Sequence, residues 1–322
     1  MGDDWGMTKW TEADLADLTD RTYVVTGATS GLGLATAAAL AAHGATVVLT
    51  GRDQQRLEAS VAAVAENATG PAPVGQMLDL ADLSSVRDAA AALVAQYPVI
   101  DVLINNAGVM ATPQRQTVDG FELQLGTNHL GHFALTGLLL PALPVADAAA
   151  DARVVTVASG AHRMGSVDPD DLFFDRRPYR AWQAYGQSKL ANLLFTAELD
   201  RRARAAEAHL TAAAAHPGYS STNLQYAGPA IAQNPVGRVV TKGMNAVIGQ
   251  SAEAGAWPTL FAATDPSVRG DDYIGPDGLL EMRGHPRLVD RSAAAQDTSV
   301  AQRLWERSEE LTGVEYEWPT PG

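Results

Sequence analysis

The strongest indication of catalysis in the sequence is the pair Tyr185 and Lys189. They stand four positions apart in residues 184–206, an alanine-rich stretch expected to be helical, so their side chains share one face. A free tyrosine titrates near ~10, too high for efficient proton exchange at neutral pH. A lysine ammonium one turn away favours the phenolate and lowers that pKa. The pair suits reversible proton transfer to an oxygen atom, although this spacing alone is far more often a surface pair.

Other polar residues accompany this pair. Ser159 follows residues 154–157, an expected strand, and brings a hydroxyl to its carboxyl end. Asn128 lies in an otherwise apolar stretch, where a polar amide calls for an explanation. Another expected strand, residues 210–215, ends in His216, Pro217 and Gly218. The carboxyl ends of the strands are the edge where open α/β sheets bind ligands.

A glycine-rich turn lies between the first expected strand, residues 23–25, and the first expected helix, residues 34–43. Its spacing, Gly-x-x-x-Gly-x-Gly, permits a tight turn and lets backbone N–H groups approach a pyrophosphate at the helix N-terminus. The motif predicts a dinucleotide site, against the alternative of an ordinary strand–helix turn. Its candidate cofactor-binding residues are Gly27, Thr29, Ser30, Gly31, Leu32 and Gly33.

The residues after the second expected strand, 46–49, bear on which dinucleotide would bind. An NAD site usually has a carboxylate at this place to hold the ribose hydroxyls. Here Gly51 has no charge to repel a 2′-phosphate, and Arg52, 19 residues beyond Gly33, can pair with one. These residues favour NADP over NAD. The alternative is a solvated arginine at a helix start, with Asp53 as N-cap.

The third and fourth expected strands, residues 76–78 and 102–104, also end at this edge. Asp79, followed by Leu80, can accept a hydrogen bond from an adenine amine or can serve as a turn residue at the strand end. The fourth strand runs into Asn105, Asn106, Ala107 and Gly108. Both segments are candidates for lining a cofactor cleft.

Short apolar runs alternate with longer alanine-rich runs through the first two-thirds of the chain. This alternation predicts an α/β fold, a three-layer, Rossmann-like, doubly wound parallel sheet with helices on both faces. With no repeat and no linker, residues 1–322 indicate a single NAD(P)-binding domain. Its parts would be a core (20–263), a loop-rich insertion (219–250) and a C-terminal extension (264–322). Further helices are expected over residues 53–67, 82–96 and 118–140, with Asp82 as an N-cap.

The composition excludes several classes of protein. The 322 residues are 46% hydrophobic and 19% charged, which is enough for a packed core. A formal net charge of −14 argues against a nucleic-acid binder, because phosphates would be repelled. The chain has no cysteine, and therefore no disulfide or thiolate site. Neither a signal peptide nor a transmembrane segment is recognisable, so a cytoplasmic protein is expected.

As an ordered set, the motifs over residues 22–222 resemble the short-chain dehydrogenase/reductase family. The resemblance implies that Tyr185 is the general acid/base and that Ser159 hydrogen-bonds the substrate oxygen. It implies that Lys189 lowers the tyrosine pKa and holds the nicotinamide ribose. Asn128 would hold a water that links Lys189 to solvent in a proton relay.

The same resemblance implies contacts with the cofactor. Gly27, Gly31 and Gly33 would form the pyrophosphate turn, and Thr222 would reach the nicotinamide carboxamide or the pyrophosphate. The remaining expected contacts around the cleft are Arg52, Asp79, Leu80, Asn105, Asn106, Ala107, Gly108, Tyr185, Lys189, Pro217 and Gly218.

One spacing departs from the usual pattern of the family. Ser159 and Tyr185 are 26 positions apart, well beyond the usual gap. This gap, together with Ala161-His162 and a tail containing residues 273–276 and Leu304-Trp305, looks like the retinol-dehydrogenase-like and WW-domain-oxidoreductase-like subgroup. That likeness implies NADP and apolar substrates. The family resemblance also implies that residues 219–250 are a substrate loop and that the C-terminal extension (264–322) covers the substrate. The aliphatic side chains of residues 219–250 either pack a short helix on the core or form a mobile lid over the substrate.

The expected function is NADP-dependent interconversion of an alcohol and a ketone or aldehyde, without a metal. Two alternatives stay open: reduction of a C=C bond by the same Tyr/Lys pair, and a non-catalytic NADP-sensing protein. His129-x-x-His132 has no accompanying metal motif, so core or capping histidines are favoured there. The chain is expected to be a homodimer through helices 118–140 and 184–206, or a monomer if the C-terminal extension covers one of those surfaces.

Overall fold

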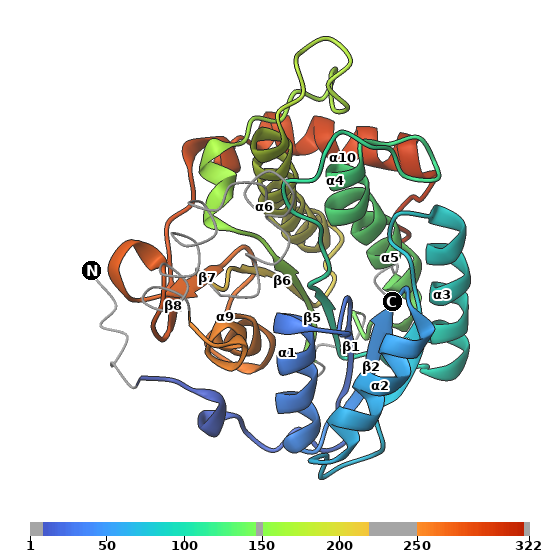
Figure 1. The fold of residues 1–322 in the computed structure, drawn as a ribbon, viewed down its shortest axis with the longest axis vertical. Coiled ribbons are helices and arrows are strands. Elements are labelled where there is room, and N and C mark those ends of the chain that lie inside the picture. The colour runs from blue at the N-terminus through green and yellow to red at the C-terminus, as the bar shows by residue number, and fades with distance from the viewer. Residues whose placement is uncertain (1–8, 146–150, 219–249, 319–322) are drawn as a thin grey trace, which may run out of the picture.

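The structure, a computed structural model, describes residues 9–145, 151–218 and 250–318. Its centre is an eight-stranded sheet in the order β3-β2-β1-β4-β5-β6-β7-β8 (Figure 1). Neighbouring strands are parallel except β7 and β8, which pair antiparallel. The predicted α/β parallel sheet is confirmed, and β7 and β8 extend it beyond the six predicted strands. The strands are β1 Thr22–Val25, β2 Thr46–Gly51, β3 Val74–Met77, β4 Val102–Asn105, β5 Ala152–Val157, β6 Leu210–Ala215, β7 Tyr273–Pro276 and β8 Pro286–Leu288.

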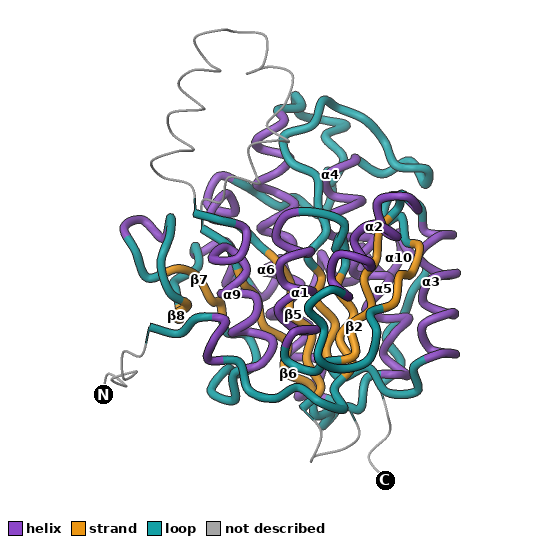
Figure 2. The backbone as a smooth tube through the Cα atoms, turned by 60° about the horizontal axis from the view of Figure 1, so that its bottom comes forward, coloured by secondary structure: helices purple, strands orange, loops and turns teal. Residues whose placement is uncertain are grey.

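Helices cover both faces of the sheet and form the predicted outer layers (Figures 1 and 2). In the described part of the chain, no helix is long and apolar enough to cross a membrane. The layer in which α1 lies beside α9 in both views contains α1 Gly31–Ala42, α2 Gln54–Ala65 and α9 Ala252–Thr264. The opposite layer contains α3 Leu83–Gln96, α5 Gly131–Leu139, α6 Ala181–Ala205 and α10 Thr298–Thr312.

The alternation of side chains along each strand explains the two hydrophobic layers. In β1, Val24 packs in the cluster that contains α3 and α5, whereas Val25 packs in the cluster that contains α1 and α9. Leu103 and Ile104 of β4 divide between the two clusters in the same way. Because both faces are covered, these strands are apolar along their length. Polar residues therefore begin where the strands end.

The structure corrects the long helix predicted over residues 118–140. Val118 is 77% exposed, and Gly120 has a left-handed backbone with φ of 85°, so the chain turns here instead of forming a helix. The side chain of Glu122 then accepts two backbone N–H groups and begins the short helix α4 Leu123–Leu125. The sequence pattern does not reveal such a turn, because the turn depends on the left-handed backbone conformation of a single residue.

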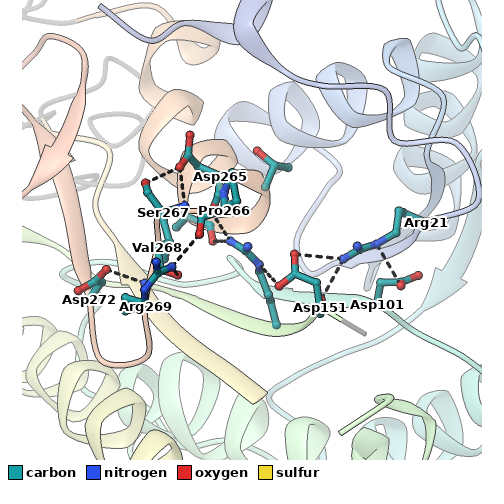
Figure 3. Close-up of polar contacts among 12 residues, drawn as sticks. Arg21, Asp101, Asp151, Asp265, Pro266, Ser267, Val268, Arg269 and Asp272 are labelled. Atoms are coloured by element: carbon teal, nitrogen blue, oxygen red, sulfur yellow. Dashed lines mark hydrogen bonds and ion pairs between the residues drawn. The ribbon is translucent and has the colours of Figure 1, made fainter. Parts of the chain in front are cut away.

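A network of ion pairs lies at the amino ends of the strands (Figure 3). Nε of Arg21 lies 3.0 Å from Oδ1 of Asp101, and its Nη2 lies 3.6 Å from Oδ2 of Asp151. The buried guanidinium of Arg153 pairs with Asp151 at 2.7 Å and donates to the carbonyl oxygen of Asp265 at 2.8 Å. This network joins the starts of β1, β4 and β5 to the end of α9.

The C-terminal helix α10 packs on α5 and α6 through aromatic side chains. The ring centroid of Trp305 lies 5.0 Å from that of Phe133 and 5.8 Å from that of Phe195. The Tyr316 ring packs at a tilt against that of Trp305, with centroids 4.5 Å apart, and its hydroxyl donates to the carbonyl oxygen of Phe133 at 2.8 Å. This part of the C-terminal extension thus covers the two helices.

Candidate active site

A cleft lies at the carboxyl edge of the sheet, between the glycine turn and the ends of β2 to β6. Most predicted cofactor-binding residues line it: Gly27, Thr29, Ser30, Gly31, Leu32, Gly33, Arg52, Asp79, Leu80, Asn106, Ala107, Gly108, Tyr185, Lys189 and Pro217. The lining also contains residues that the sequence analysis did not single out: Thr50, Arg56, Leu78, Val109, Met110, Thr127, Val157 and Ala158.

The glycine turn has a geometry that a side chain would disrupt. Gly27 has φ of +65°, and a Cβ there would lie 2.8 Å from Cα of Ala107. A Cβ on Gly33 would lie 2.4 Å from Nδ2 of Asn106. Ser30 precedes α1 but its side chain does not cap the helix, unlike the N-cap aspartates of α2 and α3. The first N–H groups of α1 therefore have no side-chain cap and can bind an anion.

Asn106 holds the glycine turn against the end of β4. Its Nδ2 donates to the carbonyl oxygen of Thr26 at 2.7 Å, and its backbone N–H donates to the Thr26 hydroxyl at 2.8 Å. Asn105, which the family resemblance placed in the cleft, is instead fully buried and donates to Oγ1 of Thr136 in α5 at 3.0 Å. Successive residues at a strand end face opposite sides, so Asn106 lines the cleft and Asn105 does not.

The end of β2 and the first turn of α2 each present an arginine to the cleft. Arg52 and Arg56 both line it, and within residues 9–145, 151–218 and 250–318 neither guanidinium has a hydrogen-bond or ion-pair partner. A Cβ on Gly51 would lie 2.4 Å from Cγ2 of Thr29, so no acidic side chain fits there unless Thr29 moves. The four-residue spacing of the arginines is visible in the sequence, although Arg52 alone was predicted.

Asp79 serves the turn after β3 and also faces the cleft. Its Oδ1 accepts from the backbone N–H of Ala81 at 3.0 Å, and its own N–H donates to Oγ of Ser85 at 2.9 Å. In the described part of the chain, Oδ2 has no hydrogen-bond partner. The geometry is thus compatible with both predicted roles, a turn residue and an acceptor for a ligand.

Tyr185 and Ser159 meet at the carboxyl end of β5. Tyr185 lies near the start of α6 and is 7% exposed, and a hydrogen bond joins its side chain to that of Ser159. Burial raises the pKa of Tyr185 to about 12, and the Ser159 hydrogen bond lowers it by less. Oγ of Ser159 also accepts from the backbone N–H of Ala161 at 3.2 Å, because it caps the short 3-10 helix Gly160–Met164.

Lys189 lies one turn beyond Tyr185, and its ammonium is held by the backbone. Nζ donates to the carbonyl oxygen of Val157 at 2.8 Å and lies 5.9 Å from the centroid of the Tyr185 ring. Burial lowers the pKa of Lys189 to about 8. Burial raises the pKa of the phenol, and Lys189 is not among the groups that shift it, so the lowered tyrosine pKa expected from this pair is not found in the chain by itself.

Asn128 lies in a π-helical turn, Gly126–Leu130, that joins α4 to α5. Its Oδ1 accepts from the N–H of Val109 at 2.7 Å, and its Nδ2 donates to the Val109 carbonyl and to Oγ of Ser188, each at 2.9 Å. A Cβ on Gly108 would lie 3.1 Å from this Oδ1, so a larger residue would press on the amide. The amide thus joins the segment after β4 to α6, and its part in a proton relay stays a prediction.

Pro217 and Gly218 turn the chain at the end of β6. Pro217 lines the cleft, whereas Gly218 has φ of +66°, and a Cβ there would lie 2.5 Å from the carbonyl oxygen of Met282. Nδ1 of His216 accepts from the N–H of Gly218 at 3.2 Å, and its Nε2 lies 3.1 Å from Oε2 of Glu281. Gly218 therefore shapes the turn without lining the cleft.

Part of the predicted site lies outside the described residues. This part comprises Thr222 and, apart from Gln250, the substrate loop expected over residues 219–250. The packed helix and the lid therefore both stay predictions for this loop.

His129 and His132 are buried under the site. Nδ1 of His132 lies 3.0 Å from the Asn128 carbonyl oxygen, and its Nε2 lies 2.8 Å from Oγ1 of Thr26. Nε2 of His129 lies 2.9 Å from Oγ of Ser308 in α10. Burial lowers the pKa of His129 to about 3 and that of His132 to about 4. Among the residues described, no group of three or more His, Cys, Asp or Glu side chains is placed to hold a metal ion.

These neutral histidines should make the fold sensitive to acid. In the unfolded chain a histidine titrates near ~6.5, so below that pH the unfolded chain binds more protons and stability falls as the pH falls. At about pH 5, each of the two histidines lowers the free energy of unfolding by on the order of 2 kcal/mol relative to neutral pH. Urea unfolding measures this loss. Between about pH 7 and 5, the free energy of unfolding should fall by about 2 kcal/mol less in His129→Leu than in the unaltered chain. His209→Gln, at an exposed position, is the control and should behave like the unaltered chain. Equal losses in His129→Leu and the unaltered chain would contradict the neutral burial of His129.

Comparisons with known proteins agree with this geometry. Residues 21–229 match the family model described as short chain dehydrogenase. Retinol dehydrogenase 13 of Homo sapiens is 37% identical over 304 residues, which cover 93% of this chain and 87% of that protein. Polyprenol dehydrogenase of Mus musculus is 38% identical over 298 residues, which cover 91% of this chain and 84% of that protein. The crystal structure of an uncharacterized protein from Mycobacterium paratuberculosis is 46% identical, with a TM-score of 0.79, and the match covers 96% of this chain and 100% of that one.

The strand order, the glycine turn and these similarities lead to one conclusion. The predicted resemblance is confirmed, both for the family and for the subgroup. The chain belongs to the short-chain dehydrogenase family, in its retinol-dehydrogenase-like subgroup, and is an oxidoreductase that acts on CH–OH or C=O groups.

Proposed function

We propose that this chain interconverts an alcohol and a ketone or aldehyde by NADP-dependent hydride transfer, with Tyr185 as the acid/base. The observation that carries this proposal is that Tyr185 and Lys189 line the same cleft as the glycine turn, with Ser159 beside Tyr185. The family binds NAD(P), and the residues fit that group. A Cβ on Gly27 or Gly33 would clash within the turn, and α1 begins without a side-chain cap.

The chain's own residues account for the movement of the proton. A reduced nicotinamide bound in the cleft would supply the hydride to the carbonyl carbon. Ser159 donates a hydrogen bond to the carbonyl oxygen and orients it beside Tyr185. Burial keeps the Tyr185 phenol protonated at neutral pH, so it can give its proton to that oxygen as the alcohol forms. The Lys189 ammonium stabilises the resulting phenolate until solvent returns a proton, and alcohol oxidation reverses these steps.

The residues at the end of β2 and in the first turn of α2 support NADP over NAD. Arg52 and Arg56 line the cleft without a partner in the described chain, and a guanidinium binds a phosphate through two parallel hydrogen bonds. Gly51 has no carboxylate to bind the ribose hydroxyls of NAD, and a side chain there would displace Thr29. The 2′-phosphate of NADP would therefore meet two cations and no acid at this position.

Arg52→Gln and Arg56→Gln should each weaken NADPH binding about tenfold or more and leave NADH binding unchanged, because NADH lacks the 2′-phosphate. Fluorescence titration of both nucleotides measures the two dissociation constants. Arg87→Gln is a matched control, since Arg87 donates to the carbonyl oxygen of Thr312 and does not line the cleft. An equal loss of NADPH and NADH affinity would contradict the assignment.

The substrate we propose is an apolar alcohol or carbonyl compound. The relatives named above are a retinol and a polyprenol dehydrogenase, and both names refer to isoprenoid alcohols. Large apolar side chains are exposed beside the catalytic residues. Met164 is 57% exposed at the end of the helix that Ser159 caps, and Trp182 is 45% exposed with its ring 6.0 Å from that of Tyr185. Such side chains suit an apolar substrate.

The proposed function is tested by the loss of NADPH absorbance with isoprenoid and other apolar aldehydes and ketones, with NADH in parallel. Identification of the product as an alcohol would support carbonyl reduction. A product with its carbonyl intact and a C=C bond saturated would instead identify a C=C reductase. NADPH binding without turnover of any compound would favour the NADP-sensing alternative.

We also propose that the chain does not dimerise through α5 and α6. Trp305 and Tyr316 pack on Phe133 and Phe195, so the chain's own C-terminal residues cover these helices. Light scattering after size-exclusion chromatography should give the monomer mass of 33.8 kDa. A dimer that persists at nanomolar concentration, with cross-links between α5 and α6 of two chains, would contradict this proposal.

A further inference from the structure

We propose that His162 is a positioning residue for Ser159 and that the C-terminal segment at Ser292 sets the tautomer in which it acts. The inference rests on the proposed function, in which Ser159 binds the substrate oxygen. His162 is not among the predicted site residues, because the sequence analysis used it only as part of the pattern that resembles the subgroup.

The imidazole of His162 has both nitrogens engaged. Nε2 lies 3.2 Å from the backbone nitrogen of Ser292. A backbone N–H can only donate, so Nε2 accepts and carries no proton. Nδ1 then carries the single proton of the neutral ring and donates it to the Ser159 carbonyl oxygen at 2.7 Å. In the opposite tautomer, a protonated Nε2 would face the N–H of Ser292, and an unprotonated Nδ1 would face the Ser159 carbonyl oxygen.

This bond is the second that His162 makes to the same oxygen. The backbone N–H of His162 also donates to the Ser159 carbonyl, at 3.0 Å. Two donors on one oxygen fix the orientation of the Ser159 peptide, which has φ of −164° and ψ of 153°. From that backbone, Oγ of Ser159 reaches both the N–H of Ala161 and the Tyr185 side chain. A rotation of the peptide would misplace the hydroxyl, and misplacements of about 1 Å in a site can be costly for turnover.

The surroundings hold the ring in its neutral form. His162 is 1% exposed, and the Tyr273 ring packs edge-on against it with centroids 5.7 Å apart. Burial lowers the pKa of His162, while the bond to Ser159 raises it by less. The charged and titratable groups that act on it are Arg163, His216 and Glu281. A proton on Nε2 would face the N–H of Ser292, so the geometry also disfavours the charged ring.

A second contact joins the same two parts of the chain. Nη2 of Arg163 donates to the carbonyl oxygen of Asp290 at 2.6 Å. The two contacts link residues 127 and 130 positions apart in the sequence. They hold the C-terminal segment against the helix that Ser159 caps. The C-terminal segment thus influences the position of the substrate oxygen through one imidazole.

The test compares His162→Asn with His162→Gln in the full chain. The Asn amide nitrogen can take approximately the place of Nδ1 and donate to Ser159. The Gln amide reaches approximately the place of Nε2 and leaves the Ser159 carbonyl without a side-chain donor. We expect kcat for carbonyl reduction to fall about tenfold in His162→Gln and less than about threefold in His162→Asn. The dissociation constant of NADPH should be unchanged in both.

Two further measurements separate positioning from a structural role. Thermal unfolding of both variants is recorded, because a structural role would lower kcat in step with the melting temperature. Equal kcat values in the two variants, or losses that follow the melting temperature, would overturn the inference. Nitrogen-15 spectra of the imidazole need no turnover, and they should place the proton on Nδ1; a proton on Nε2 would overturn the inference. If the unaltered chain turns over no carbonyl compound, the proposed function fails, and these spectra still decide whether His162 holds Ser159.

Discussion

Tyr185→Phe is expected to reduce kcat for carbonyl reduction by about 100- to 10,000-fold while the dissociation constant of NADPH stays unchanged. The substitution removes the hydroxyl that would deliver the proton and keeps the ring that packs against Trp182 at 6.0 Å. The fold loses one hydrogen bond, to Ser159, and should lose about 1 kcal/mol of stability. Stopped-flow measurement of NADPH consumption at saturating substrate isolates kcat from binding.

Tyr179→Phe is a matched control for this experiment. The Tyr179 hydroxyl donates to the carbonyl oxygen of Thr112 at 2.9 Å and accepts from Nε2 of Gln124 at 2.8 Å. It does not line the cleft, so its removal should lower stability slightly and leave kcat within about twofold. Turnover retained in Tyr185→Phe, or lost equally in both variants, would exclude Tyr185 as the proton donor.

Lys189→Met is expected to lower kcat by on the order of 100-fold, because the phenolate would lose its nearest cation. The fold should tolerate the change, since methionine matches the buried stem of lysine. The carbonyl oxygen of Val157 keeps a second donor, Nδ2 of Asn192 at 3.1 Å. Removal of a buried ammonium also removes its desolvation cost. A variant that unfolds, or one with undiminished kcat, would contradict the role given to Lys189.

Lys189→Met also tests how the stability of the fold changes with pH, a change whose direction follows from the pKa of Lys189. Burial lowers the pKa of Lys189 from 10.5 to about 8, so between these values the unfolded chain binds more protons than the folded one. Stability should therefore rise with pH in this window, by on the order of 2 kcal/mol between about pH 8 and 9.5. Lys189→Met should lack this rise. Chemical unfolding at three pH values measures it, and an identical pH dependence in both chains would place the ammonium in water.

Many features of this structure depend only on residues that are close together in the sequence, and these features could be predicted from the sequence. The six predicted strands are found because strands covered on both faces are short apolar runs bounded by polar residues. Asp82 caps α3 as predicted, accepting the N–H groups of Ser84 and Ser85, because a cap depends on neighbours two and three positions away. The glycine turn and the Tyr185–Lys189 pair follow from equally local geometry.

The features that could not be predicted depend on contacts between residues far apart in the sequence. The strands β7 and β8 have four and three residues without a clear alternation, and they are strands because they pair with β6 and with each other. The sequence cannot tell which of Asn105 and Asn106 faces the cleft, because that depends on how β4 meets the helices around it. It also cannot place Lys189 Nζ on the Val157 carbonyl instead of the phenol, or predict the burial that raises the Tyr185 pKa to about 12.

Sequence patterns were thus enough to identify the chemical groups of the family and the edge of the sheet at which they gather. Periodicity, caps and strand ends are properties of a few consecutive residues. The orientation and protonation of those groups depend instead on how the chain folds. Burial and hydrogen bonds between distant segments, such as that of His162 with Ser292 at 130 positions' separation, act only once the chain has folded.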